Sequence, residues 1–472
     1  MSPVPTTAPR TRPLDRRGFL RNLGLLGAGI SLSSLPIGFA DAAAAHTGGA
    51  RSLVCVFLEG GADSFNMFVP RDHRTAGQTH ATYSSTRGAF AVPASQLLPV
   101  GDGAFGLHPE LTSLAGIADS GRLATITNVG PLARPTNQTD VVERRSIPQS
   151  LFAHDAQRKL WQTGRPGLAD DVGWGGSVAA AVANGSEVPG AFSISGSNIW
   201  QNSAVAAASR LSPTVRIERL LGYDASLRSW LPSFGGVEAV LGKALAVADR
   251  STNAFDQLAA TNLRQSITTT TALQDATADS AANEVGMEDI GGNRLAMQLE
   301  QVARLIKNRE ALGMPRQVFF VRMGGWDTHR IQQELFPILL AELDQALGSF
   351  QTALDRLGVA DSVTTFTASD FGRTLTINGD GTDHGWGGHA FVMGGAVNKG
   401  RYGTFPSYST NNNPDDISSN ARDFAGRLIP TTSVAQYGAT LSRWMGLSDP
   451  QLTQAFPELE NFDASDLGFL SA

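Results

Sequence analysis

The sequence contains a single cysteine among its 472 residues, which excludes a fold held together by intramolecular disulfide bonds. Cys55 lies in the apolar run LVCVFL, where a small buried hydrophobic side chain is its expected role. The 43 acidic residues outnumber the 37 lysines and arginines, and the formal net charge is −6 at pH 7. Because the basic residues do not cluster, we expect no binding to nucleic acid.

Several catalytic motifs are also missing. The chain has no G-x-S-x-G elbow, no H-E-x-x-H helix and no Walker A phosphate loop, which disfavours lipase-like serine hydrolases and nucleotide-dependent enzymes. GDGAFG at 101–106 matches G-x-G-x-x-G, but no clear strand precedes it, so a hairpin or loop is expected there. With 7 Trp and 5 Tyr, stacking platforms of a carbohydrate-binding protein are not obvious.

Long hydrophobic runs that could span a bilayer are absent after the N-terminal region. Residues 1–45 carry Arg16 and Arg17, then a weakly apolar stretch to about Ala40 and small residues. This pattern is typical of a cleaved twin-arginine signal peptide, and the short, glycine- and serine-containing stretch disfavours the alternative of a membrane anchor. We therefore expect the twin-arginine translocase to export the folded chain to the periplasm or the medium, without a stable membrane anchor.

Short apolar runs and amphipathic helical patterns follow one another along the chain. They predict strands at 52–58, 123–129, 318–325, 363–370 and 389–397, and helices at 108–119 and 331–358. Such a succession predicts an α/β fold with a parallel sheet flanked by helices. The Ala-, Ser- and Thr-rich segment at about 195–295 predicts a largely helical insertion in a single domain, 46–472.

Polar side chains gather at the ends of the predicted strands, where open parallel sheets bind their ligands. Four strand ends run into polar, mostly acidic or histidine-bearing segments. They contribute Glu59, Asp63, Asp327, His329, Asp370, Asp380, Asp383, His384 and His389. Residues this far apart in sequence but at one edge of a sheet indicate a metal or phosphate site.

Two pairs carry the metal hypothesis. Asp327 and His329 point the same way in extended backbone, and carboxylate and imidazole are good ligands for zinc or manganese. The alternative is that Asp327 caps the following helix and His329 lies at the surface. Asp383 and His384 lie in a glycine-rich run with the same two interpretations, metal ligands or a turn-rich loop with solvated histidine.

Three further residues have two interpretations each. Arg373 could clamp an anionic oxygen, or form an ion pair with Asp370 or a neighbouring carboxylate. Ser64 could be a nucleophile or a helix N-cap. His154, alone in a predicted helix, is expected to have a packing or surface role.

Several long segments resemble one family. VFLEGGADSFNMFVP, LFAHDAQRKLWQTG, GGWDTH and TTFTASDFGRTLTINGDGTDHGWGGH, in this order, are similar to the DUF1501 family of exported bacterial proteins of undetermined activity. That family is similar in turn to the alkaline phosphatase–sulfatase superfamily. The resemblance implies an alkaline-phosphatase-like α/β fold and one or two divalent metals. It also implies a Ser, Thr or modified Cys nucleophile, and cleavage of phosphate or sulfate monoesters.

The resemblance also implies roles for individual residues. It implies metal ligands at Asp327, His329, Asp370 and His384, with Asp63 or Glu59 at the first-strand position. From its spacing beside His384, we add Asp383 to the predicted metal ligands. As our own hypothesis, the catalytic residues are Asp63, Ser64, Arg373 and His389, the last two contacting the anion. The superfamily usually has Asp-His where Asp370 precedes Phe371 here, and the nucleophile stays open among Ser64, Ser150 and Thr136.

These expectations combine into one hypothesis and one rival. The hypothesis is an exported hydrolase that uses zinc, manganese or calcium to cleave phosphate or sulfate monoesters, of a small molecule or a polysaccharide. The rival is a binding or envelope-assembly protein that keeps the fold and has lost the chemistry.

Overall fold

The computed structural model describes a large part of the chain. The described residues are 49–168, 171–183, 190–203, 208–211, 223–224, 229–230, 245–248, 250–276, 284–287, 290–417 and 426–471. The predicted signal peptide at 1–45 lies outside these ranges, as does much of the predicted insertion at 195–295. Among the described helices, none has the length and apolar character needed to cross a membrane.

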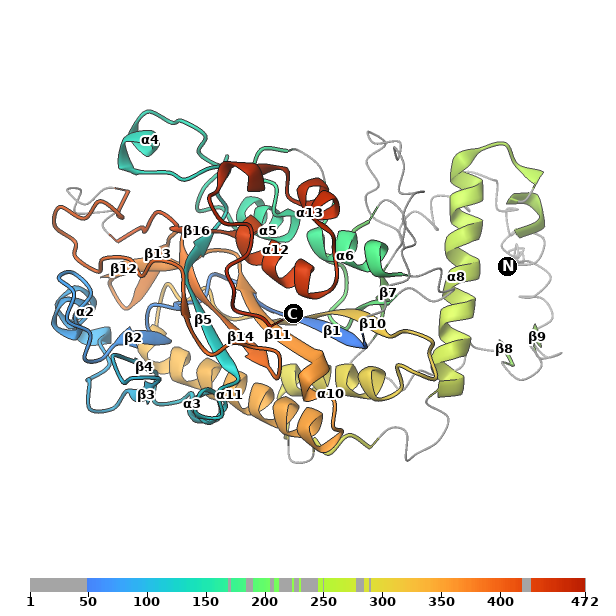
Figure 1. Ribbon diagram of the computed structural model, residues 1–472, viewed down its shortest axis with the longest axis horizontal. Coiled ribbons are helices and arrows are strands. Elements are labelled where there is room, and N and C mark those ends of the chain that lie inside the picture. Colours follow the sequence, from blue (N-terminus) through green and yellow to red (C-terminus); the bar gives the residue numbers. More distant parts are fainter. Residues whose placement is uncertain are drawn as a thin grey trace, which may run out of the picture. The chain divides into compact units, whose positions relative to one another are not determined.

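A sheet of nine strands, counted over the described residues, forms the centre of the fold (Figure 1). Its order is β15-β5-β14-β11-β1-β10-β6-β7, and β16 pairs with β5. The strands are β1 (Arg51–Leu58), β5 (Leu123–Gly130), β6 (Ala191–Ser193), β7 (Ser209–Arg210), β10 (Arg316–Met323), β11 (Val363–Ser369), β14 (Gly388–Gly394), β15 (Gly400–Tyr402) and β16 (Thr432–Ser433).

The middle of this sheet is parallel, as predicted. β1 pairs in parallel with β10 on one side and with β11 on the other. The register places Leu58 opposite both Met323 and Ser369, so the three strands end together. The segments that follow them, distant in sequence, therefore begin at one edge of the sheet.

The strand β14 departs from the predicted parallel arrangement. It runs antiparallel to both β11 and β5. A parallel return requires a crossover connection, usually a helix. The chain between β11 and β14 instead forms a hairpin of β12 (Arg373–Asn378) and β13 (Gly381–His384), and so comes back in the opposite direction.

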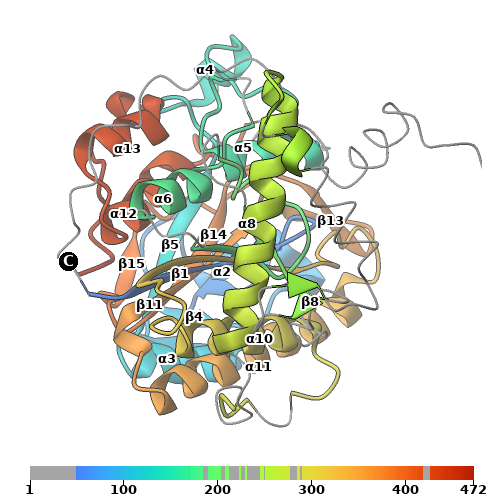
Figure 2. The same ribbon diagram turned by 90° about the vertical axis from the view of Figure 1, so that its right-hand side faces the viewer.

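Helices cover both faces of the sheet, as the two views in Figures 1 and 2 show. On one face lie α3 (Thr112–Asp119), α10 (Arg294–Lys307) and α11 (Gln332–Arg356), and on the other α5 (His154–Thr163), α6 (Trp174–Val182), α12 (Val434–Trp444) and α13 (Asp449–Ala455). Alternate residues of β1 face the two layers: Val54 and Val56 join one hydrophobic cluster, whereas Leu53 and Cys55 join the other. This α/β architecture is the predicted fold class, and Cys55 is buried as expected.

Smaller elements surround this core. They are α2 (His80–Arg87), α4 (Gln138–Val142), α8 (Ala254–Ala276), β2 (Phe68–Pro70), β3 (Leu98–Val100), β4 (Phe105–Leu107), β8 (Tyr223–Asp224), β9 (Ser229–Trp230) and the 3-10 turns Gly88–Phe90, Ala360–Ser362 and Pro457–Asn461. The GDGAFG motif connects the antiparallel strands β3 and β4, which confirms the predicted hairpin. α8 lies within the predicted insertion and is helical.

A buried ion pair lies under the carboxyl edge of the sheet. The Arg87 guanidinium contacts the Asp63 carboxylate, and neither side chain is exposed. Asp63 also accepts a hydrogen bond of 2.6 Å from Gln332 Nε2, and Arg87 Nη1 donates to the carbonyl of Thr374 at 2.9 Å. The pair thereby joins the segment after β1 to α2, α11 and β12.

A buried histidine lies near this ion pair. His389 packs edge-on against Phe65 and Phe68, with ring centroids 5.1 and 5.9 Å away. Its Nδ1 accepts the backbone N–H of Asn128 at 3.1 Å, so its Nε2 carries the proton and donates to Tyr408 Oη at 2.8 Å. Burial lowers the pKa of the His389 imidazole to about 3, so the ring is neutral at pH 7.

This depressed pKa predicts a loss of stability in acid. Below pH 6.5 the unfolded chain protonates His389 while the folded chain does not, so the stabilisation present above pH 6.5 declines toward pH 3. The slope from one such group is at most about 1.4 kcal/mol per pH unit. Melting curves between pH 7 and 4 should show a shallower decline for His389→Gln than for wild type. Equal slopes for the two proteins would contradict the prediction.

Candidate metal centre

Ionisable side chains from three parts of the chain converge at the carboxyl edge of the sheet. His154 is the first residue of α5. Asp327 and His329 lie between β10 and α11, and His384 ends β13. The ends of β10 and the β12–β13 hairpin thus bring together residues more than 50 positions apart.

His154, Asp327 and His384 form the centre of this cluster. One ligand atom from each lies within 4.8 Å of the other two. The Asp327 carboxylate lies between the rings, with Oδ1 at 3.2 Å from His384 Nε2 and Oδ2 at 3.4 Å from His154 Nε2. A carboxylate and two imidazole nitrogens are donors that suit zinc and related divalent ions.

His329 adds a third imidazole at the solvent side. Its Nε2 lies 3.0 Å from Asp327 Oδ1 and 2.8 Å from His384 Nε2. The side chains of His329 and Asp327 are 41% and 44% exposed, so this side of the cluster is open to small molecules.

Each of the three histidines has its other ring nitrogen against an acceptor. His154 Nδ1 lies 2.6 Å from Asp370 Oδ2, His329 Nδ1 lies 3.2 Å from Asp383 Oδ1, and His384 Nδ1 lies 2.6 Å from the carbonyl of Phe152. These acceptors assign the proton to Nδ1 and leave the Nε2 lone pair free. Metal-binding histidines have this arrangement, because the acceptor fixes both the tautomer and the ring orientation.

The free Nε2 lone pairs repel one another and the Asp327 carboxylate. With every Nδ1 protonated, His329 Nε2 and His384 Nε2 are both acceptors and cannot hydrogen-bond to each other across 2.8 Å. Both also face the Asp327 carboxylate. A positive charge among these atoms would remove the repulsion, so the donor set fits a divalent cation.

Asp327 is kept ionised by a buried arginine. Burial favours its neutral form, but the hydrogen bond and the charge of Arg373 lower the pKa of Asp327 below its usual value. Arg373 Nη1 donates to Asp327 Oδ1 at 2.7 Å. The remaining contacts of its guanidinium are with Gly60 and Thr382, and its side chain has no exposed surface. The structure therefore favours the ion pair with a neighbouring carboxylate over contact with an external anion.

Asp370 and Asp383, both predicted as metal ligands, contact the Nδ1 atoms of His154 and His329, on the side of each ring away from Asp327. Asp370 is fully buried and holds His154. Burial raises the pKa of Asp370, while the hydrogen bond from His154 and the charge of Arg158 oppose this rise. The Asp383 carboxylate contacts His329 Nδ1 and accepts a hydrogen bond of 2.9 Å from Asn378 Nδ2. Metal-ligand roles for these two aspartates stay predictions. In this structure their hydrogen bonds orient the rings of His154 and His329.

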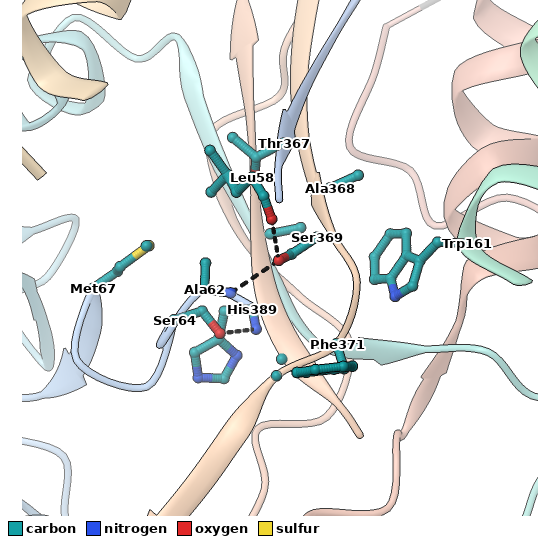
Figure 3. Close-up of a pocket in the computed structure, with 13 residues that line it drawn as sticks. Leu58, Ala62, Ser64, Met67, Trp161, Thr367, Ala368, Ser369, Phe371 and His389 are labelled. Carbon is teal, nitrogen blue, oxygen red and sulfur yellow. Dashed lines mark hydrogen bonds between the residues drawn. The ribbon is translucent and has the colours of Figure 1, made fainter. Parts of the chain in front are cut away.

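The other predicted catalytic residues lie deeper. Asp63 forms the buried ion pair with Arg87. Ser64 is 3% exposed, and its Oγ accepts the backbone N–H of His389 at 2.7 Å. Figure 3 shows Ser64 and His389 on one side of a small cavity, inside the fold. The catalytic roles of Asp63, Ser64 and His389 stay predictions, while their side chains are engaged within the core.

Some neighbouring residues differ from their expected roles. His154, for which packing or a surface position was expected, belongs to the central group. Its place in the LFAHDAQ segment, which carries the family resemblance, was the available signal. Glu59 contacts Arg158 and Arg322 at 2.5 and 3.1 Å, and Asp380 Oδ2 accepts the N–H of Ile331 at the start of α11.

Comparison with known proteins supports the family resemblance. A family model described as "Protein of unknown function (DUF1501)" matches residues 238–454. No curated protein matches the chain. Among solved structures, the PsFucS1 sulfatase from Pseudoalteromonas sp. aligns with 85% of this chain and 68% of its own, at 10% identity and a TM-score of 0.31. The chain therefore matches the DUF1501 family model over residues 238–454, and this range includes Asp327, His329 and His384.

Proposed function

We propose that the protein is a metal-dependent hydrolase of phosphate or sulfate monoesters. The observation that carries this proposal is the convergence of three Nε2 lone pairs on the Asp327 carboxylate, with every Nδ1 anchored. His154, Asp327 and His384 are the proposed ligands. Three protein ligands leave a position for substrate, as catalytic zinc sites do.

The donor set selects among the candidate ions. Calcium prefers oxygen ligands, which disfavours it beside several imidazoles. Zinc and manganese accept imidazole together with carboxylate, and zinc fits three nitrogen- and oxygen-bearing side chains best. When bound, such a cation would act as a Lewis acid that polarises an ester oxygen and makes water more acidic.

The surrounding residues have separate tasks in this proposal. Arg373 holds Asp327 ionised from below, and Asp370 orients His154. His329 is the most exposed of the three histidines, and Asp383 holds its Nδ1. We assign His329 Nε2 as the acceptor of a proton from the attacking water, because it faces the open side of the cluster. Water is the proposed nucleophile, since Ser64 is buried and engaged with His389.

Metal content tests the ligand assignment. Elemental mass spectrometry of the purified protein should find about one equivalent of zinc or manganese, held by the three proposed ligands. His384→Ala should lose it, because one imidazole of the central group is removed. His73→Ala, which removes a partly buried histidine outside the cluster, is the control and should retain the metal. Folded wild-type protein without metal after growth in metal-replete medium would refute the assignment.

Turnover tests the role of His329. Wild-type protein should hydrolyse an aryl phosphate or an aryl sulfate, and His329→Ala should lower kcat by about 10²-fold or more while its metal content stays unchanged. Loss of metal together with activity would instead make His329 a ligand. A wild-type protein that holds metal but cleaves neither ester would favour the rival, an exported binding or envelope-assembly protein on the same fold.

Export is also part of the proposal. The twin-arginine pattern of residues 1–45 supports transport of the folded chain to the periplasm or the medium. Replacing Arg16 and Arg17 together by lysine should retain the protein in the cytoplasm, as cell fractionation and immunoblotting would show. Equal amounts of exported protein with and without the two substitutions would reject this route.

A further inference from the structure

The helix that begins with His154 carries buried polar atoms that lack partners. Gln157 has no exposed surface, and neither its Nε2 nor its Oε1 has a hydrogen-bond partner within the described residues. One turn later, Trp161 is 6% exposed, and its indole N–H has no partner there either. Residues four apart lie on one face of a helix, so both side chains belong to the inner face of α5.

Two more such atoms lie beside the same helix. Asp370 Oδ1 and Arg158 Nε are 3.8 Å apart, too far for a hydrogen bond, and neither has another hydrogen-bond partner in the described part of the chain. We refer to Gln157, Arg158, Trp161 and Asp370 as the α5 seam. Native proteins pair most of their buried polar groups, and leaving several unpaired in one place is costly. The seam therefore indicates a ligand that bonds to these atoms.

A small cavity beside Trp161 limits the size of this ligand. A space of about 20 Å³ adjoins the seam at Trp161, and Thr367, Ser369 and Phe371 are among its other lining residues. In Figure 3, Trp161 faces Ser369 and Phe371. A water molecule needs about 10–15 Å³, whereas an ester substrate or a hydrated cation needs far more. The volume fits water at Trp161. The unpaired atoms of Gln157, Arg158 and Asp370 include both donors and acceptors, which a water molecule can pair.

We propose that the α5 seam is an internal hydration site behind the metal centre. Water in the cavity accepts the Trp161 indole N–H, and water in the seam bonds to the Gln157 amide and bridges Asp370 Oδ1 to Arg158 Nε. A polar contact beyond 3.5 Å is commonly bridged in this way. Because Asp370 Oδ2 holds His154 Nδ1 at 2.6 Å, water on Oδ1 fixes the carboxylate and, through it, the imidazole. This positioning role rests on the proposed function, whereas the hydration site does not.

Two glutamines on α5 provide a matched test. Gln162 is 4% exposed, and its Oε1 accepts the N–H groups of Ile199 and Trp200 at 2.8 and 3.0 Å. Gln162→Leu should lower the melting temperature, because it leaves the buried N–H of Trp200 and the partly buried N–H of Ile199 unpaired. Gln157→Leu should lower it too if water bonds to the amide. A dry seam predicts the opposite, a rise in melting temperature, because the substitution then removes two unpaired polar atoms, and this result would overturn the proposal.

Direct observation and metal affinity complete the test. A crystal structure of the full mature chain should show ordered water within hydrogen-bond distance of Trp161 Nε1, and an empty cavity would overturn the proposal. Titration with zinc should show binding about 10-fold weaker in Gln157→Leu than in wild type, because the water on Asp370 Oδ1 loses a partner, and unchanged in Gln162→Leu. Unchanged zinc affinity in Gln157→Leu would reject the positioning role. Absence of zinc binding in wild type would refute the proposed function, while the water and the melting temperatures still decide on the hydration site.

Discussion

The ion pair between Asp327 and Arg373 is the interaction on which the rest of the candidate site depends. It holds a half-exposed carboxylate in place from beneath, and the histidine nitrogens gather around that carboxylate. Arg373 is held in turn by Thr382, whose Oγ1 donates to Gln332 Oε1 at 2.8 Å. Gln332 reaches Asp63 and its partner Arg87, so the position of Asp327 is tied to the buried core through a continuous set of hydrogen bonds.

The sheet explains why this ion pair and the histidines meet. β1 and its two neighbours end in register, and the segments after β10 and β11 therefore emerge at the same edge, on either side of β1. The β12–β13 hairpin brings Arg373 and His384 opposite each other as paired residues. The same hairpin turns the chain so that β14 returns antiparallel to β11. One local feature thus accounts both for the position of His384 and for the break in the parallel sheet.

The sequence predicted at which edge of the sheet the ionisable residues gather, but not how their side chains are arranged there. Apolar runs located β1, β10 and β11, and the carboxyl-end rule then selected Asp327, His329 and His384. Helical periodicity cannot tell whether a partly exposed histidine faces solvent or another element, so His154 was expected to have a packing or surface role. The sequence gives no information on burial depth, so it could not show that the Asp370 and Asp383 carboxylates contact the far ring nitrogens of His154 and His329.

Phe371 bears on how many cations this edge can hold. It follows Asp370 directly, and its apolar ring lies 4.8 Å from the His154 ring and 4.5 Å from the His384 ring. A phenyl ring supplies no ligand and limits water on that side. The donors consequently gather on the opposite side, around Asp327, where Arg373 already neutralises one negative charge. Since a second divalent ion would have to share this single carboxylate, the arrangement favours a site for one cation.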